Sequence, residues 1–256
     1  MFMDYLKQIS RGLFKVISLL VFLLFFGYYS FAQKSLSISY GLPKIDWTYD
    51  GNFDALRTDW RTGWSVNILG AKTYANNLTV GIEASVNRYG ISFQFDRMRY
   101  DLGEIHHFSV LPYIGYDHKL AESRFSTQFN LGIGIGFIPV DNKYYVNDQT
   151  FQIRRLAGKD ANGNPTSRPL YDLTFSGSQE ARNRFFALIK PNVQLSYSLN
   201  EKSALFLRAA LGISLSKSVL ERDFPEVVFE NENHSVLHTT NFSFSALELG
   251  YRYTLK

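Results

Sequence analysis

The chain has 256 residues, of which 45% are hydrophobic and 16% aromatic, and its formal net charge is +4. This composition excludes an intrinsically disordered chain and suits one domain of barrel or sandwich type. The sequence contains no cysteine, which excludes disulfides and thiolate metal sites.

The N-terminus has the order of a secretory signal peptide. Three basic residues precede an apolar run from Val16 to Tyr29, and the small residues Ser30 and Ala32 follow the run. The run is shorter than the ~20 residues that a spanning helix needs, so we predict cleavage after Ala32 rather than a membrane anchor. Removal of residues 1–32, with three basic residues and one acidic residue, would lower the formal charge from +4 to +2. Because no basic stripe remains, we expect no nucleic-acid partner.

The remaining chain alternates apolar residues with small or polar residues through eight segments. A period of two is typical of strands whose two faces meet different surroundings. The hairpin from Arg184 to Ser216 shows the pattern most fully, and its strands are longer than the ~5 or 6 residues typical of soluble sheets. They also exceed the ~9 to 11 residues that a tilted strand needs to cross a bilayer. The predicted strands are 35–42, 60–70, 78–86 with alternation continuing to 95, 105–117, 125–137, 184–199, 203–216 and 238–255.

Three positions disturb this alternation. Pro112 and Pro191 lie within strands and each lacks a backbone donor, which predicts a bulge or a local break in pairing. In the last segment the apolar residues change parity between Ala246 and Leu247, which predicts another bulge.

The connections between the strands alternate between long and short. We expect the long ones to be loops, because they lack the period of two. Long loops on one rim and short turns on the other are typical of transmembrane β-barrels. The sequence therefore predicts an all-β fold, an eight-stranded antiparallel up-and-down transmembrane β-barrel over residues 33–256, with its polar face towards the lumen and its aliphatic face towards lipid. A soluble lipocalin-like barrel would require the opposite arrangement. The long connections are 43–59, 96–104, 138–182 and 217–237, and the short ones are 71–77, 118–123 and 200–202.

The C-terminal octet from Glu248 to Leu255 resembles the β-signal that the barrel-assembly machinery recognises in outer-membrane proteins. Glu248, Gly250, Tyr253 and Leu255 match its polar, glycine and two hydrophobic positions, whereas Lys256 stands where an aromatic residue is common. With this octet and its eight segments, the chain resembles the small Bacteroidetes outer-membrane β-barrel domain family that includes the PorT-like proteins, with OmpA and OmpX barrels as structural relatives. The resemblance implies the cell outer membrane as location and the assembly machinery as a partner during biogenesis.

Five charged residues fall on the small or polar face of their strands. Because an eight-stranded lumen is too narrow for a channel and unpaired buried charge is costly, we expect them to form a charge network that fills the lumen. The alternative is a conduction or proton path. These residues are Glu83, Lys190, Arg208, Glu248 and Arg252.

His107 and Ser109 share one strand face, with Glu104 close by in sequence. They resemble the His-x-Ser element of outer-membrane lipid A deacylases, in which a glutamate is the third member. The alternation places both residues towards the lumen and away from lipid, so we expect no catalytic residues. We also expect no cofactor and no metal.

We therefore expect a non-enzymatic outer-membrane barrel with a plugged polar lumen. It would act by binding through its extracellular loops, or as an accessory subunit of an outer-membrane secretion or assembly complex. Its partners would be outer-membrane lipid and a protein bound at the extracellular loops or periplasmic turns. An outer-leaflet lipid A deacylase and a small-solute pore are the alternatives.

Overall fold

The structure is a computed structural model that describes residues 33–53, 56–95, 98–120, 123–139, 144–159, 161–162 and 165–255. All regular elements of this part are β-strands. Within these residues no helix has the length and apolarity needed to cross a bilayer. The predicted signal peptide, residues 1–32, lies outside the described residues.

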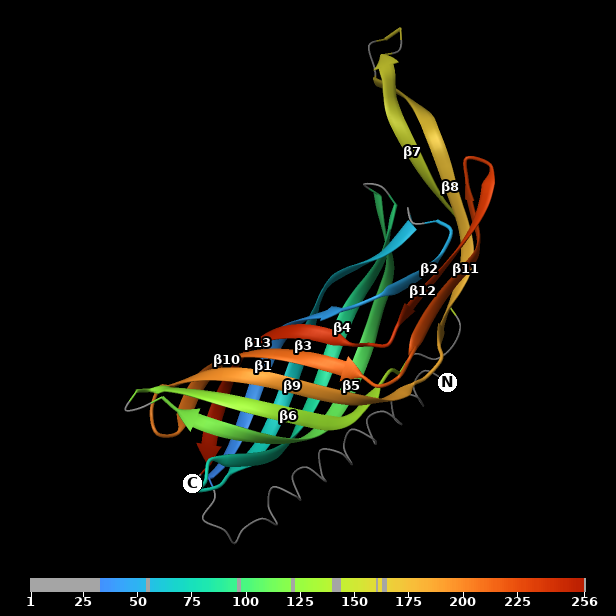
Figure 1. The fold of residues 1–256 in the computed structure, drawn as a ribbon. Coiled ribbons are helices and arrows are strands. Elements are labelled where there is room, and N and C mark those ends of the chain that lie inside the picture. Colours follow the sequence, from blue (N-terminus) through green and yellow to red (C-terminus); the bar gives the residue numbers. More distant parts are fainter. Residues whose placement is uncertain are drawn as a thin grey trace, which may run out of the picture.

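Eight antiparallel strands close into a barrel, which confirms the predicted fold class (Figure 1). The order around the barrel is β1-β13-β10-β9-β6-β5-β4-β3, and pairing between the first and last strands, β1 and β13, closes it. The strand ends at Thr73, Lys119 and Ser198, which lead into short connections, lie at one end of the barrel, and this is also the end where β1 begins and β13 ends. The strands are β1 (Gln33–Ile45), β3 (Leu56–Thr73), β4 (Leu78–Phe95), β5 (Met98–Lys119), β6 (Phe125–Phe137), β9 (Phe185–Ser198), β10 (Ser203–Ser214) and β13 (Phe244–Leu255).

The barrel wall is apolar outside and polar inside. On β1, for example, Leu36 and Ile38 are about half exposed, whereas Ser37 and Ser39 between them are buried. Soluble proteins rarely expose apolar patches larger than a few hundred Å², and this alternation is that of a wall in contact with lipid. Further outward apolar side chains include Ile114, Phe129, Ile133, Ile135, Leu195, Leu205, Leu207, Leu247 and Leu249.

The long connections form a second, five-stranded sheet, so the predicted loops at 43–59, 138–182 and 217–237 are wrong over much of their length. We call this the external sheet; it lies beyond the end of the barrel, and its β7–β8 hairpin projects furthest (Figure 1). The predicted loop at 96–104 is also largely strand, because β4 continues to Phe95 and β5 begins at Met98. The external sheet has the order β2-β12-β11-β8-β7, with β2 (Thr48–Gly51), β12 (Glu232–Thr240), β11 (Leu220–Phe229), β8 (Pro165–Ala181) and β7 (Tyr144–Lys159).

Irregular pairing explains why these strands lack a period of two. The β7–β8 hairpin shifts register at three places, and β11 shifts against both of its neighbours near Glu226. Each shift inserts or removes a residue and thereby exchanges the two faces of the strand. In addition, the buried face of β11 and β12 carries Arg222 and His238. Because these two residues are polar, they interrupt the apolar alternation by which a strand is predicted.

The bulge predicted between Ala246 and Leu247 is wrong. β13 pairs with β1 and with β10 in one continuous register from Phe244 onwards. The chain breaks instead between β12 and β13, where Phe242 has a left-handed φ of 62°. Phe244 and Ala246 then point inward. Because both are apolar, the apolar residues of the sequence appear to switch from even to odd positions although the strand does not change its register.

Both prolines lie at interruptions of the ladder without a change of register, which confirms the local breaks. Leu111 and Pro112 have no partners in β6, although Val110 and Tyr113 on either side pair in the same register. Pro191 pairs with Leu131 of β6, whereas the ladder between β9 and β10 is interrupted at this level. A missing backbone donor at each proline accounts for these gaps.

We predict that the external sheet is protected from amide hydrogen exchange. In membranes or detergent, amides of β11 and β12 should exchange much more slowly than those of the turn at 199–202, because ladder hydrogen bonds must open before exchange occurs. Mass spectrometry of peptides from both segments of one sample measures this difference. Equal exchange in the two segments would mean that 217–237 is a loop after all.

Candidate functional site: the lumen and the external sheet

Four charged side chains meet in the middle of the lumen. Glu83 of β4, Lys190 of β9, Arg208 of β10 and Glu248 of β13 are each at most 4% exposed. We call these four residues the quartet. Two carboxylates and two cations make its formal charge zero, so the buried charges compensate one another.

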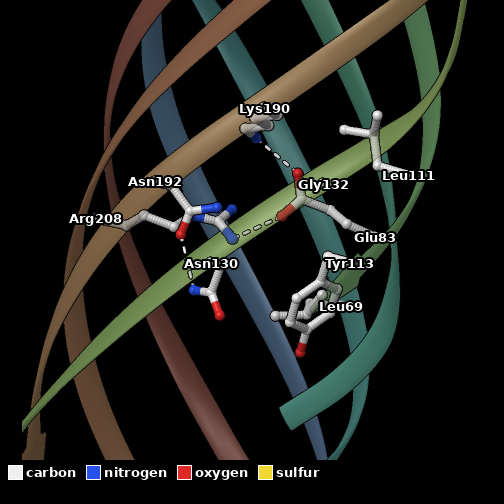
Figure 2. A pocket seen from close by; sticks show the side chains of 9 residues that line it. All are labelled: Leu69, Glu83, Leu111, Tyr113, Asn130, Gly132, Lys190, Asn192 and Arg208. Atoms are coloured by element: carbon white, nitrogen blue, oxygen red, sulfur yellow. Dashed lines mark hydrogen bonds and ion pairs between the residues drawn. The ribbon is translucent and has the colours of Figure 1, made fainter. Parts of the chain in front are cut away.

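Direct hydrogen bonds close the quartet, and Figure 2 shows those that Glu83 accepts from Lys190 and Arg208. Lys190 Nζ donates to Glu83 Oε1 at 2.6 Å and to Glu248 Oε1 at 3.1 Å. Arg208 Nη1 donates to Glu83 Oε2 at 2.6 Å, while its Nε donates to Glu248 Oε2 at 2.6 Å and its Nη2 contacts the same oxygen. Each carboxylate therefore binds both cations. Such charge-assisted hydrogen bonds are the strong ones, and here they connect strands on different sides of the barrel.

Strand register and small neighbours make this arrangement possible. Arg208 and Glu248 are direct cross-strand partners between β10 and β13. Gly41 lies opposite Glu248 on β1, and a Cβ at Gly41 would come within 2.7 Å of the Glu248 side chain. Ser39 accepts a hydrogen bond from Arg208 and donates one to Glu248 Oε2 at 3.1 Å. The small inward residues of β1 thus provide both space and a further polar contact.

Arg252, the fifth residue predicted for this network, lies apart from the quartet. Its Nη1 is 3.8 Å from Asp117 Oδ2, nearer the short turns, and both side chains are less than one-fifth exposed. Because Arg252 lies four positions after Glu248 in an extended strand, the rise of about 3.4 Å per residue places their Cα atoms roughly 14 Å apart. The sequence predicted contacts for Arg252 within the charge network and did not indicate Asp117, which lies at the end of its predicted strand.

Little space remains beside the quartet. The cavity there has a volume of about 10 Å³, which is enough for about one water molecule. Asn130 and Asn192 line it and share a hydrogen bond of 2.9 Å, and Tyr113 lies at the same cavity (Figure 2). The remaining lining residues are Leu69, Glu83, Leu111, Gly132, Lys190 and Arg208.

An apolar layer fills the lumen between the quartet and the external sheet. It combines residues of the barrel strands with Val219 and Leu220, where the chain enters the external sheet. The ring of His107 is fully buried in it, with ring centroids 5.2 Å from Phe186 and 5.9 Å from Phe242. Sequence reasoning missed this layer, since it placed inward apolar residues of β13 on the lipid face. Its members are Ile45, Tyr89, Ile105, Leu111, Ile138, Phe186, Leu188, Val219, Leu220, Phe242, Phe244 and Ala246.

His107, Ser109 and Glu104 do not assemble into a catalytic triad. Ser109 Oγ lies 2.5 Å from Ser85 Oγ, and His107 Nδ1 lies 3.4 Å from Asn87 Nδ2. Glu104 is on the other face of β5, where it is exposed and accepts a hydrogen bond from Arg88 at 2.5 Å. No base is therefore positioned on the Ser109 hydroxyl among these three residues.

The inner face of the external sheet buries a cation that sequence reasoning also missed. Arg222 is 1% exposed; its Nε donates to Gln179 Oε1 at 2.8 Å, and its guanidinium lies 5.0 Å from the centre of the Trp47 ring. Burial lowers the pKa of this guanidinium to about 9. His238 lies opposite Arg222 on β12 and makes an edge contact with the ring of Tyr49 on β2. These contacts connect four strands of the external sheet.

The outer face of the external sheet is acidic. Arg182 donates to Glu221 Oε2 at 2.6 Å and lies 3.4 Å from Glu180, and these contacts raise the pKa of its guanidinium. The other carboxylates on this face are exposed to solvent. We call this surface the acidic face, formed by Asp50, Glu180, Glu221, Asp223 and Glu226. Among the described residues, no group of three or more His, Asp or Glu side chains is arranged to hold a metal ion.

Comparisons with known proteins bear on the fold. No family model matches the sequence, and neither does any curated protein. The structure is similar to the outer membrane protein OprG of Pseudomonas aeruginosa, with a TM-score of 0.52, 8% identity, and 88% of this chain and 96% of that chain covered. It is also similar to the outer membrane protease OmpT of Escherichia coli, with a TM-score of 0.40, 9% identity and coverage of 89% and 99%. The first similarity shows that the fold is that of outer-membrane β-barrels.

We predict that Arg208→Ala destabilises the barrel by about 3 to 5 kcal/mol, because it leaves two buried carboxylates with one cation. The unfolding midpoint in detergent should fall far more than for Arg124→Ala, which removes an exposed arginine at a short turn. The double variant Arg208→Met/Glu248→Leu should lose less than Arg208→Ala, since Glu83 and Lys190 remain as a neutral pair. Equal midpoints for Arg208→Ala and Arg124→Ala would show that the quartet does not stabilise the fold.

Proposed function

We propose that this chain is a non-enzymatic outer-membrane β-barrel with a closed lumen, which acts by binding a partner protein through its external sheet. The observation that carries this proposal is the contrast between its two halves. The barrel interior is filled by the quartet and the apolar layer, whereas the long connections fold into a sheet with a charged, solvent-exposed face.

The filled interior argues against a solute pore. A solute would have to pass the quartet, where the cavity is only about 10 Å³, and then the apolar layer. Opening this path would expose paired buried charges and separate the aromatic side chains around His107. Eight-stranded barrels are generally just wide enough for side chains to fill them, and this interior follows that rule.

The arrangement around Ser109 argues against the deacylase alternative. Its hydroxyl contacts Ser85 and faces the lumen, while Glu104 lies on the opposite face of the strand. An outer-leaflet lipid substrate would approach from the lipid face. Neither the geometry nor the access route of a lipid-modifying enzyme is therefore present in these residues.

The external sheet has the properties of a preformed binding surface. Its inner face is held together by Arg222, by His238 and by buried aromatic residues such as Phe175 and Phe224. A rigid surface loses less conformational entropy on binding than a flexible loop does. The acidic face suits a partner with a basic surface, because complementary charge speeds encounter and favours one orientation.

The proposal includes a location in the cell outer membrane and membership of a particular barrel family. Export with cleavage after Ala32, and recognition of the octet from Glu248 to Leu255 by the barrel-assembly machinery, would deliver the chain to the cell outer membrane. The apolar outer wall supports the location. The pattern of the mature chain as a whole supports membership of the Bacteroidetes family that includes the PorT-like proteins. Service in a secretion or assembly complex would be one use of the external sheet.

We predict that a partner contacts the external sheet in native cells. Because the chain contains no cysteine, Val228→Cys places a single thiol beside the acidic face, at a residue that is 37% exposed. A thiol-reactive photocrosslinker at this position should give a specific protein adduct. The adduct should be lost when Asp223→Lys and Glu226→Lys are added.

The matched control is Lys202→Cys in a short turn at the opposite end of the barrel. No adduct at Val228→Cys, with or without an adduct at Lys202→Cys, would contradict binding by the external sheet. An adduct at Lys202→Cys alone would assign the contact to the periplasmic turns instead.

A further inference from the structure

The lipid-facing wall of the barrel contains a hollow of about 870 Å³. It crosses five neighbouring strands in the order β1, β13, β10, β9 and β6. Adjacent strands are about 4.8 Å apart, so the hollow extends roughly 19 Å across the wall. This length is that of an extended fatty acyl chain.

Small outward side chains form the floor of the hollow. The floor residues are Ala209, Pro191 and Ser245. They are smaller than the outward residues around them, which are leucine, valine or phenylalanine. At the same level the ladder between β9 and β10 is interrupted beside Pro191. The larger side chains around this floor are Leu42, Phe129, Val193, Leu211 and Leu247.

One end of the hollow carries a positive charge. Lys44, paired with Ser245 in register, is one residue from the end of β1 that leads to the external sheet. It is exposed, and it is the only charged residue among the described residues that line the hollow. This rim is at the end of the barrel nearer the external sheet, while the apolar part of the hollow lies nearer the short turns.

We propose that the hollow binds one acyl chain of a phosphate-bearing membrane lipid of the outer leaflet, with Lys44 binding the phosphate. The position of the hollow favours a lipid as its ligand, because the surrounding wall exposes apolar side chains that face lipid. An acyl chain can lie along this mainly apolar hollow, and each methylene that it buries there contributes to binding. The charge of Lys44 complements the phosphate and fixes which end of the lipid lies at the outer rim.

The test is native mass spectrometry of protein released from nanodiscs. The nanodiscs would contain phosphatidylglycerol and a chain-matched galactosyl diacylglycerol, which has no phosphate. The parent protein should retain one phosphatidylglycerol in preference to the galactolipid. Ala209→Phe, which fills the floor of the hollow, should reduce this retention about tenfold, corresponding to about 1.4 kcal/mol. Lys44→Gln should abolish the preference for the phosphate while the chain still binds.

Ala187→Phe is the matched control, since Ala187 is an outward alanine of β9 outside the hollow. Lys217→Gln is the control for charge, because Lys217 is an exposed cation just beyond β10. Both variants should retain lipid like the parent, and heat-modifiable gel mobility checks that every variant is folded. Unchanged retention by Ala209→Phe would overturn the proposal. A second outcome would also overturn it: the parent protein forms dimers that hold no lipid, and Ala209→Phe dissociates these dimers. The hollow would then be an interface between two copies of the chain.

Discussion

The structure depends on charge neutrality within the quartet. Taking a single ion from water into a protein interior costs several kcal/mol, and mutual attraction offsets this cost only when geometry and hydrogen bonding are good. Here both cations bind both carboxylates, and Ser39 takes part as well. The four residues come from β4, β9, β10 and β13, so their contacts hold the wall together across the lumen. The strand register and the small residues of β1 make this packing possible, and the packing leaves no wide passage among the described residues of the lumen.

The apolar layer joins the barrel to the external sheet. Phe244 and Ala246 enter it from β13, while Val219 and Leu220 enter it from the start of the external sheet. The two parts therefore share one set of buried contacts at the end of the barrel. Thr240, the last residue of β12, adds a hydrogen bond of 2.8 Å to the backbone of Asp46. This continuity allows the long connections to form a sheet instead of mobile loops.

The sequence was sufficient to predict the barrel, because its strands keep one apolar and one small or polar face over most of their length. It also indicated that Arg208 and Glu248 point inward on neighbouring strands. It could not indicate the external sheet, where register shifts exchange the faces of β7, β8 and β11. Nor could it separate Phe244 from the lipid-facing residues, because a phenylalanine suits either an apolar lumen or lipid. Arg252 points to the same inward face as the quartet residues. Only its position along β13, nearer the short turns, places it beside Asp117.

The central claim is that side chains close the lumen, and planar-bilayer recording tests it most directly. Purified protein inserted into a bilayer should show no stable conductance under conditions in which a porin control conducts. The quartet and the apolar layer should prevent ions from crossing at moderate applied voltage. A stable, porin-sized conductance from the wild-type protein would contradict this account, because the same charged residues would then line a working channel.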